Sequence, residues 1–146
     1  MLRRVADYHV LLIEDSLADA ELIRVALGRL PFDIALDHAY TGQEALQQYK
    51  ATIDNLKQPS VLLVLLDLSL PGTDSFALLD AFREAAPHHI APVVVFSGTG
   101  DPATIRKVLR THARAFVSKS GDLEQFMQRV SRIVEVFLSC AEWPML

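Results

Sequence analysis

The segment that most constrains the fold is the run VLLVLL, residues 61–66, which is followed directly by the carboxylate of Asp67. The run shows no polar alternation, and it is too short for a typical helix or a membrane span. Such runs are typical of parallel strands that are covered on both faces. Asp67 is therefore expected at the carboxyl end of a buried strand, where open α/β sheets bind their ligands.

Strand-like and helix-like segments alternate along the rest of the chain. Beside the run at 61–66, strands are expected at residues 8–14, 32–40, 91–100 and 113–119. Ser16 with Asp19 three residues later resembles a capping box at the start of the first helix, and Asp122 is expected to cap a long last helix. This order predicts a flavodoxin-like (βα)5 fold, a doubly wound parallel sheet of strand order 2-1-3-4-5 with an extended last helix.

The composition limits the class of protein. The chain has 146 residues, 51% of them hydrophobic, and a formal net charge of -4 without a long basic run. A single domain over residues 1–146 is expected, and nucleic-acid binding has little support. Cys140 is the only cysteine, which fits a reducing compartment. Since neither a signal peptide nor a membrane span is expected, the prediction for localisation is the cytoplasm.

Polar residues stand where four of the expected strands end. The first strand ends in Glu14 and Asp15, the third in Asp67, the fourth in Ser97 and the fifth in Lys119. The carboxyl ends of parallel strands open on the same edge of a sheet. Three carboxylates in one crevice repel one another unless a cation intervenes, and oxygen ligands favour Mg²⁺. The set is suited to phosphoryl transfer, with Asp67 as the nucleophile that becomes an aspartyl phosphate.

Each of these residues taken singly has a simpler explanation. An acidic pair before a helix favours the helix dipole, Ser97 is a small residue at a strand end, and Lys119 can be a solvated strand end. His88 and His89 are expected in a solvated loop and not at a metal site. The combination of all the residues, each at its own strand end, favours a functional site.

At this point the sequence resembles the response regulator receiver domain. The resemblance covers residues 8 to about 140 and rests on the motifs LLIEDS, LLDLSLPGTD, VVVFSGTG and AFVSKS. It implies that Asp67 accepts a phosphoryl group from a sensor histidine kinase. It also implies that Asp15, Asp67 and the backbone carbonyl of Ser69 bind Mg²⁺, with Glu14 acting through water.

The resemblance assigns further roles around Asp67. Lys119 would pair with the phosphoryl group, and Ser97 would move toward it while Phe116 turns inward as the switch. Ser69 and Thr99 stand at positions that tune hydrolysis of the acyl phosphate. The expected protein is thus a phosphoacceptor with intrinsic autophosphatase activity and not a conventional enzyme.

The carboxyl-terminal segment DLEQFMQRVSRIVEVFLSCAEWP resembles that of phytochrome-associated, single-domain response regulators. This likeness implies a phytochrome-type kinase partner, no output domain, and a homodimer formed by the last helix and the tail 141–146. The apolar positions of the last helix cover more than the one stripe that docking on a sheet requires, which independently favours a buried partner surface.

Two positions differ from the family pattern. Ser75 replaces the usual glycine after the loop aspartate, and Ser120 replaces the proline of the usual Lys-Pro pair. A cis bond before a non-proline residue costs about 3 kcal/mol. A trans Lys119–Ser120 bond is therefore expected, with a shifted Lys119.

Three other functions stay open at the level of sequence. The first is a pseudo-receiver, an interaction module that is not phosphorylated because the altered Lys119–Ser120 loop makes it sluggish. The second is a phosphatase of the haloacid type, which requires an aspartate where this chain has Ser69. The third is a flavodoxin-like flavin binder, which has little support because no phosphate-binding loop follows the first strand.

Overall fold

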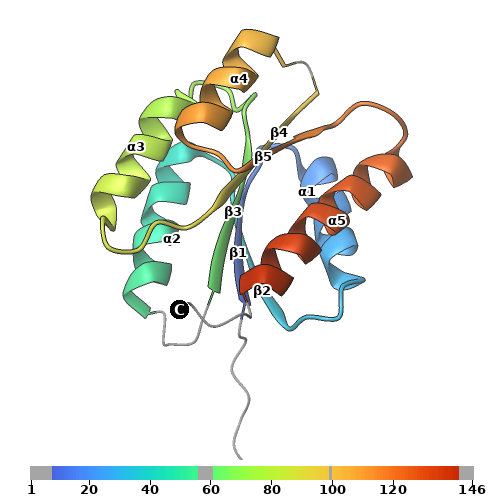
Figure 1. The fold of residues 1–146 in the computed structure, drawn as a ribbon, viewed down its shortest axis with the longest axis horizontal. Helices are drawn as coiled ribbons and strands as arrows, with labels where there is room; N and C mark the ends of the chain where they lie inside the picture. Colours follow the sequence, from blue (N-terminus) through green and yellow to red (C-terminus); the bar gives the residue numbers. More distant parts are fainter. Residues whose placement is uncertain (1–7, 56–60, 99, 142–146) are drawn as a thin grey trace, which may run out of the picture.

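The computed structural model describes residues 8–55, 61–98 and 100–141, and it forms a central sheet with helices on both faces (Figure 1). The strands are β1 (Tyr8–Ile13), β2 (Ile34–Ala39), β3 (Val61–Asp67), β4 (Val93–Ser97) and β5 (Ala115–Ser118). The helices are α1 (Leu17–Gly28), α2 (Gly42–Asn55), α3 (Ser75–Ala85), α4 (Pro102–Thr111) and α5 (Leu123–Ala141). The strands are parallel in the order β2-β1-β3-β4-β5, which confirms the predicted fold.

Successive side chains of the central strands point to opposite faces of the sheet, which divides the core into two layers. In β1, Leu11 and Ile13 pack with α2 and α3, whereas Val10 and Leu12 pack with α1 and α5. The same alternation continues in β3 and β4, so each central strand is buried on both faces. This explains the continuous apolar runs, because neither face of these strands contacts solvent. Figure 1 shows α1 and α5 together on one side of the sheet and α2 and α3 on the other.

The strand at 91–100 is shorter than expected from the sequence. β4 begins at Val93. The Pro92 carbonyl accepts a bond from Val64 N–H at 3.0 Å, but proline has no N–H to donate to the sheet. It ends at Ser97, before the glycines at 98 and 100. The shorter strand places Ser97 at the carboxyl edge of the sheet.

Backbone hydrogen bonds continue the sheet ladder into the residues that follow the strands. Glu14 N–H donates to the Ala39 carbonyl at 3.0 Å, and Lys119 N–H donates to the Ser97 carbonyl at 3.0 Å. Leu68 N–H donates to the Phe96 carbonyl at 2.9 Å. The polar side chains after the strands therefore start from backbone that the sheet holds in place.

Candidate functional site

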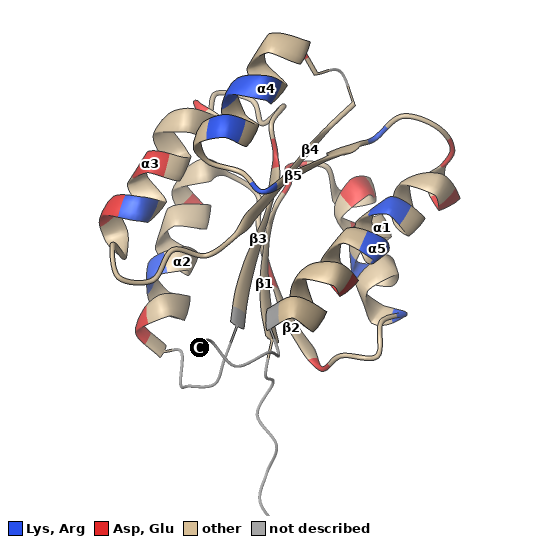
Figure 2. Cartoon of the chain, viewed as in Figure 1, with Lys and Arg blue, Asp and Glu red and all other residues tan. Residues whose placement is uncertain are grey.

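Lys119 joins the polar side chains at the carboxyl edge of the sheet. Its ammonium Nζ lies 3.2 Å from Asp67 Oδ2 and 3.2 Å from Glu14 Oε2. Figure 2 shows acidic segments gathered at this edge, close to the basic segment that follows β5. The Lys119 side chain is only 16% exposed, and Asp67 and Glu14 are buried. The predicted convergence of β1, β3 and β5 at one site is present in the structure.

Glu14 is fully buried, and burial is the main reason why its carboxyl is difficult to ionise. Desolvation raises the pKa of Glu14 to about 8 from 4.5, and a hydrogen bond and the charge of Asp67 add to the rise. Lys119 and the Ser16 N–H, which donates to Glu14 Oε1 at 3.0 Å, oppose it. Burial thus favours the neutral form of Glu14 near neutral pH, whereas a bound cation would favour the ionised form.

Asp67 is supported by the residues that follow it. Ser69 N–H donates to Asp67 Oδ1 at 2.8 Å, while Asp67 Oδ2 accepts from Lys119. The hydroxyl oxygens of Ser69 and Ser97 lie 2.8 Å apart, so β4 is joined to the β3–α3 loop. Gly72, at φ 65°, provides the turn that leads to Asp74, whose carboxylate caps α3 at Phe76 and Ala77 N–H. The role of the Ser69 carbonyl as a metal ligand stays a prediction.

The three predicted acidic ligands are close enough to share one cation. Glu14, Asp15 and Asp67 each offer a carboxylate oxygen within 4.8 Å of the others. Asp15 is exposed, whereas the other two are buried, so the group opens to solvent on one side. An all-oxygen set with a solvent-facing side fits Mg²⁺, which keeps several of its waters when bound.

The loop after β5 holds Lys119 without the usual proline. Arg129 Nη1 on α5 donates to the Ser118 carbonyl at 2.9 Å and to the Ser120 carbonyl at 2.6 Å. Gly121, at φ 90°, then turns the chain toward α5. The Lys119 ammonium lies within hydrogen-bond distance of Asp67, and Arg129 joins the carbonyls on either side of it. The expected shift of Lys119 stays a prediction. The trans geometry of the Lys119–Ser120 bond stays a prediction.

Of the two remaining predicted residues, the structure describes Phe116, which lies beside the centre of the site. Phe116 in β5 is half-buried and packs against the core on the α2–α3 face of the sheet. It also lines a shallow apolar groove with Arg129, Ile133 and Val136 of α5. Thr99 lies outside the described residues.

Asp19 is a site residue that the sequence analysis did not identify as one. Its Oδ2 lies 2.8 Å from Lys119 Nζ, nearer than either Glu14 or Asp67. The sequence analysis placed Asp19 in a capping box, and Ser16 Oγ does accept from Asp19 N–H at 3.2 Å. An acid in the first turn of a helix is an ordinary capping and dipole feature, so no local pattern distinguishes this one.

Comparison with known proteins identifies the family. The response regulator receiver domain matches residues 10–131. The chain belongs to this family. It is 27% identical to the response regulator Rcp1 of Synechocystis over 137 residues, which is 92% of each protein.

Solved receiver structures agree with the fold as well as with the sequence. A phosphorylated cyanobacterial phytochrome response regulator, RcpA, superposes with a TM-score of 0.76 at 30% identity, over 94% of this chain and 98% of RcpA. The Mn²⁺-bound form of Rcp1 superposes with a TM-score of 0.74 at 26% identity, over 94% and 99%. Since receiver domains bind Mg²⁺ at an acidic site, the group formed by Glu14, Asp15 and Asp67 fits the family.

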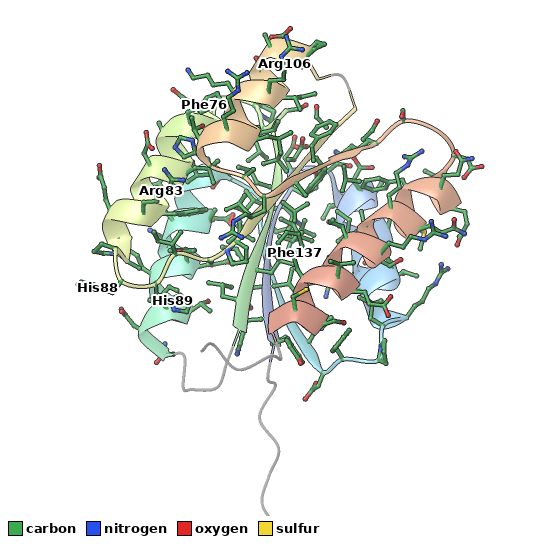
Figure 3. All side chains as sticks on the ribbon, in the orientation of Figure 1. Phe76, Arg83, His88, His89, Arg106 and Phe137 are labelled. Atoms are coloured by element: carbon green, nitrogen blue, oxygen red, sulfur yellow. The ribbon has the colours of Figure 1, made fainter. Side chains whose placement is uncertain are left out.

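The histidine pair lies away from this site. His88 and His89 follow α3 in the connection to β4, at the amino-terminal edge of the sheet (Figure 3). His88 is exposed, and the His89 carbonyl accepts from the Tyr49 hydroxyl at 3.2 Å. None of the described helices combines the length and apolarity needed to cross a bilayer.

Proposed function

We propose that Asp67 is the phosphoacceptor of a Mg²⁺-dependent phosphorelay, and that its phosphoryl donor is a phytochrome-type sensor histidine kinase. The environment of Asp67 supports this proposal most directly. Its carboxylate is buried, bonds to Lys119 Nζ at 3.2 Å and shares an acidic cluster with Glu14 and Asp15. A fixed ammonium beside a buried carboxylate is suited to stabilise negative charge that develops during phosphoryl transfer.

The proposed reaction is a direct displacement at phosphorus. An Asp67 carboxylate oxygen forms the new P–O bond while the P–N bond to the kinase histidine breaks, and the electron pair stays on the imidazole. Lys119 donates to a phosphoryl oxygen, which neutralises part of its charge. Mg²⁺ held by Asp15, Asp67 and the Ser69 carbonyl, with Glu14 acting through water, would neutralise more of it. Hydrolysis by water then restores the carboxylate and releases phosphate, the proposed autophosphatase activity.

Ser97 and Phe116 are proposed as the switch. The Ser97 hydroxyl is on β4 at the same edge as Asp67 and bonds to Ser69 in the described state. A phosphoryl oxygen on Asp67 is a stronger, charged acceptor than a serine hydroxyl, so Ser97 is expected to turn toward it. Its movement opens space behind β4, into which the half-buried ring of Phe116 turns.

The proposal of a phytochrome-type kinase rests on similarity. The similarity to Rcp1 extends over nearly the whole of this chain. The phosphorylated phytochrome response regulator RcpA is 30% identical to this chain. The alternative pseudo-receiver role rested on the altered Lys119–Ser120 loop. No observation favours it, because the Lys119 ammonium lies within hydrogen-bond distance of Asp67.

We further propose a homodimer formed by α5 and the tail 141–146. One stripe of α5 is buried in the core: Phe126, Val130, Val134 and Leu138. Met127 is buried as well. In Figure 3, Phe137 lies on the sheet-facing side of the same helix, where it packs against that core. Val136, outside this stripe, is 56% exposed and lines the apolar groove beside β5. Residues 142–146 lie outside the described residues.

Incubation with acetyl phosphate and Mg²⁺ tests the central proposal. The wild-type protein should gain the mass of one phosphoryl group, and Asp67→Asn should gain none. A matched Asp37→Asn variant, which changes an exposed aspartate on the edge strand β2, should label like wild type. An unlabelled wild-type protein, under conditions that label another receiver domain, would contradict the proposal.

A further inference from the structure

The ammonium of Lys119 uses all of its hydrogen-bond donors in the described structure. A lysine ammonium has three N–H groups and no acceptor. Lys119 Nζ has one carboxyl-group oxygen as acceptor for each of them: Asp19 Oδ2 at 2.8 Å, Glu14 Oε2 at 3.2 Å and Asp67 Oδ2 at 3.2 Å. A phosphoryl oxygen can therefore bind Lys119 only if one of these acceptors is released.

The acceptor that can be released is Asp67 or Glu14. Phosphorylation converts the Asp67 carboxylate into an acyl phosphate, a mixed anhydride, and so removes the carboxylate charge, which weakens its oxygens as acceptors. Glu14 is fully buried, so a charge on its carboxyl group is costly to maintain. Asp19 is 32% exposed at its side chain, so its charge costs less to maintain. Asp19 can therefore stay hydrogen-bonded to the Lys119 ammonium throughout the reaction.

The fold leaves the Asp19 carboxylate free for this contact. In a complete capping box, the acid at the third helical position would accept the N–H of the N-cap residue. Here the Ser16 N–H donates to Glu14 Oε1 at 3.0 Å. Only one half of the box is present, in which Ser16 Oγ accepts from Asp19 N–H. The cap still begins the helix, while the Asp19 side chain extends across to Lys119.

The side chains also meet because they share one face of the sheet. Leu12 of β1, Leu65 of β3 and Val117 of β5 all point to the layer covered by α1 and α5. Glu14, Asp67 and Lys119 lie two residues beyond each of them, so the period of a strand directs them to the same side. Asp19 is in the first turn of α1, which covers this layer. Its contact with Lys119 thus links α1 to the β5–α5 loop, 100 residues away in the chain.

We propose that Asp19 is a positioning residue that anchors the Lys119 ammonium beside Asp67 while the ammonium exchanges its bond to Asp67 for one to the phosphoryl group. This inference rests on the proposed function of Asp67. Without the anchor, the long lysine side chain would lose its fixed direction when Asp67 ceases to be a charged acceptor. Displacements of about 1 Å are sufficient to slow a positioned reaction severely.

The ordinary alternative is that Asp19 only stabilises α1 as an acid near its positive end. That role belongs to any acid near the start of the helix, and Glu21 provides the matched control. It is exposed, and its ion pair among the described residues is with Arg24 at 3.6 Å. Asp19→Ala removes both charge and acceptor, whereas Asp19→Asn keeps an oxygen that can accept from Lys119. Glu21→Ala and Glu21→Gln make the same changes two residues away.

The first measurement is the ammonium signal of Lys119 in ¹H–¹⁵N spectra of the metal-free protein at low temperature. The chain has four lysines, and the signal is assigned by its loss in Lys119→Met. When all three N–H groups of an ammonium are hydrogen-bonded, its protons exchange slowly with water and its signal is observable. The signal should persist in wild type, Asp19→Asn and both Glu21 variants, and should be lost in Asp19→Ala. Its persistence in Asp19→Ala would overturn the proposal.

The second measurement is the rate of labelling by acetyl phosphate with Mg²⁺. Asp19→Ala should be slower than wild type by about tenfold or more, and Asp19→Asn should stay within about threefold of it. Equal rates in Asp19→Ala and Glu21→Ala, or equal losses in the two Asp19 variants, would overturn the anchoring role. If wild type itself is not labelled, the proposed function fails, while the ammonium signal still decides whether Asp19 anchors Lys119.

Discussion

The hydroxyl oxygens of Ser69 and Ser97 lie 2.8 Å apart, so the proposed switch hydroxyl already has a partner before any phosphoryl group is present. Ser97 must release Ser69 in order to reach Asp67. In Ser69→Ala, the Ser97 hydroxyl has no such partner to lose. A neutral hydrogen bond contributes about 1 kcal/mol, so the affinity for beryllofluoride with Mg²⁺ should rise by about fivefold.

Titration of the Ser97 backbone amide shift with beryllofluoride measures this affinity. Ser131→Ala removes a serine hydroxyl on α5 that donates to the Gln128 carbonyl, and it should leave the affinity unchanged. Equal or weaker binding by Ser69→Ala would mean that the serine pair does not restrain the switch.

Magnesium affinity should depend on pH through Glu14. Burial raises the pKa of Glu14 to about 8, so below that pH a cation must displace its proton. Affinity should rise about tenfold per pH unit between pH 6 and 7 and level off above pH 8, with nearly one proton released at pH 7. Calorimetry in two buffers of different ionisation enthalpy counts that proton. Glu14→Gln should remove this pH dependence, and an unchanged slope in the variant would refute the assignment to Glu14.

The raised pKa of Glu14 also predicts how the stability of the metal-free protein depends on pH. A carboxyl whose pKa is raised on folding favours the folded state below its unfolded pKa, and that contribution is lost as pH rises from about 4.5 through about 8. Glu14→Gln should therefore gain stability relative to wild type as the pH rises, by at least about 1 kcal/mol between pH 5 and 9. Urea unfolding at both pH values measures the difference. A constant difference would show that Glu14 does not titrate in this range.

Arg129 should be important for the position of Lys119 although it does not touch the site. Its guanidinium donates to the carbonyls of Ser118 and Ser120, on either side of Lys119. Arg129→Ala should lower the free energy of unfolding by about 1.5 kcal/mol, because hydrogen bonds from a charged group are removed. Labelling by acetyl phosphate should also be slower. The exposed Arg132, three residues along α5, provides the control Arg132→Ala, which should change neither quantity.

The proposed dimer should depend on the apolar face of α5. Val136→Glu places a charge at a side chain that is 56% exposed beside the groove with Phe116 and Ile133. Burying this charge without a partner would disfavour association, so the variant should sediment as a monomer at concentrations where wild type is a dimer. Val25→Glu on α1, where valine is 43% exposed, should not change the association. A monomeric wild type at all concentrations would contradict the dimer.

Much of the fold followed from the sequence because strands and helices have different apolar periods. The run 61–66 is continuous because β3 is central and covered on both faces, and the alternation in 32–40 is that of an edge strand. Asp67 and Lys119 could be placed together because the carboxyl ends of parallel strands meet at one edge. The length of β4 was overestimated, since periodicity does not register that Pro92 lacks an N–H.

The partners of Lys119 were less predictable. Asp19 and Arg129 reach this loop from α1 and α5, and neither has a local pattern that separates it from an ordinary helix acid or a surface arginine. The missing proline suggested a displaced lysine, but it gave no sign that Arg129 would hold the carbonyls on either side of Lys119. Such contacts depend on how helices lie on the sheet.

The sequence by itself determined which residues stand at the strand ends. The apolar period of each strand stops at a defined position, and the acidic or basic residue stands there. Only the tertiary structure decided how those groups are paired. An ammonium selects its three acceptors by distance and burial, and these depend on the packing of α1 and α5 against β1, β3 and β5. Asp19 therefore belongs to the site by its position in space and not by any motif in the chain.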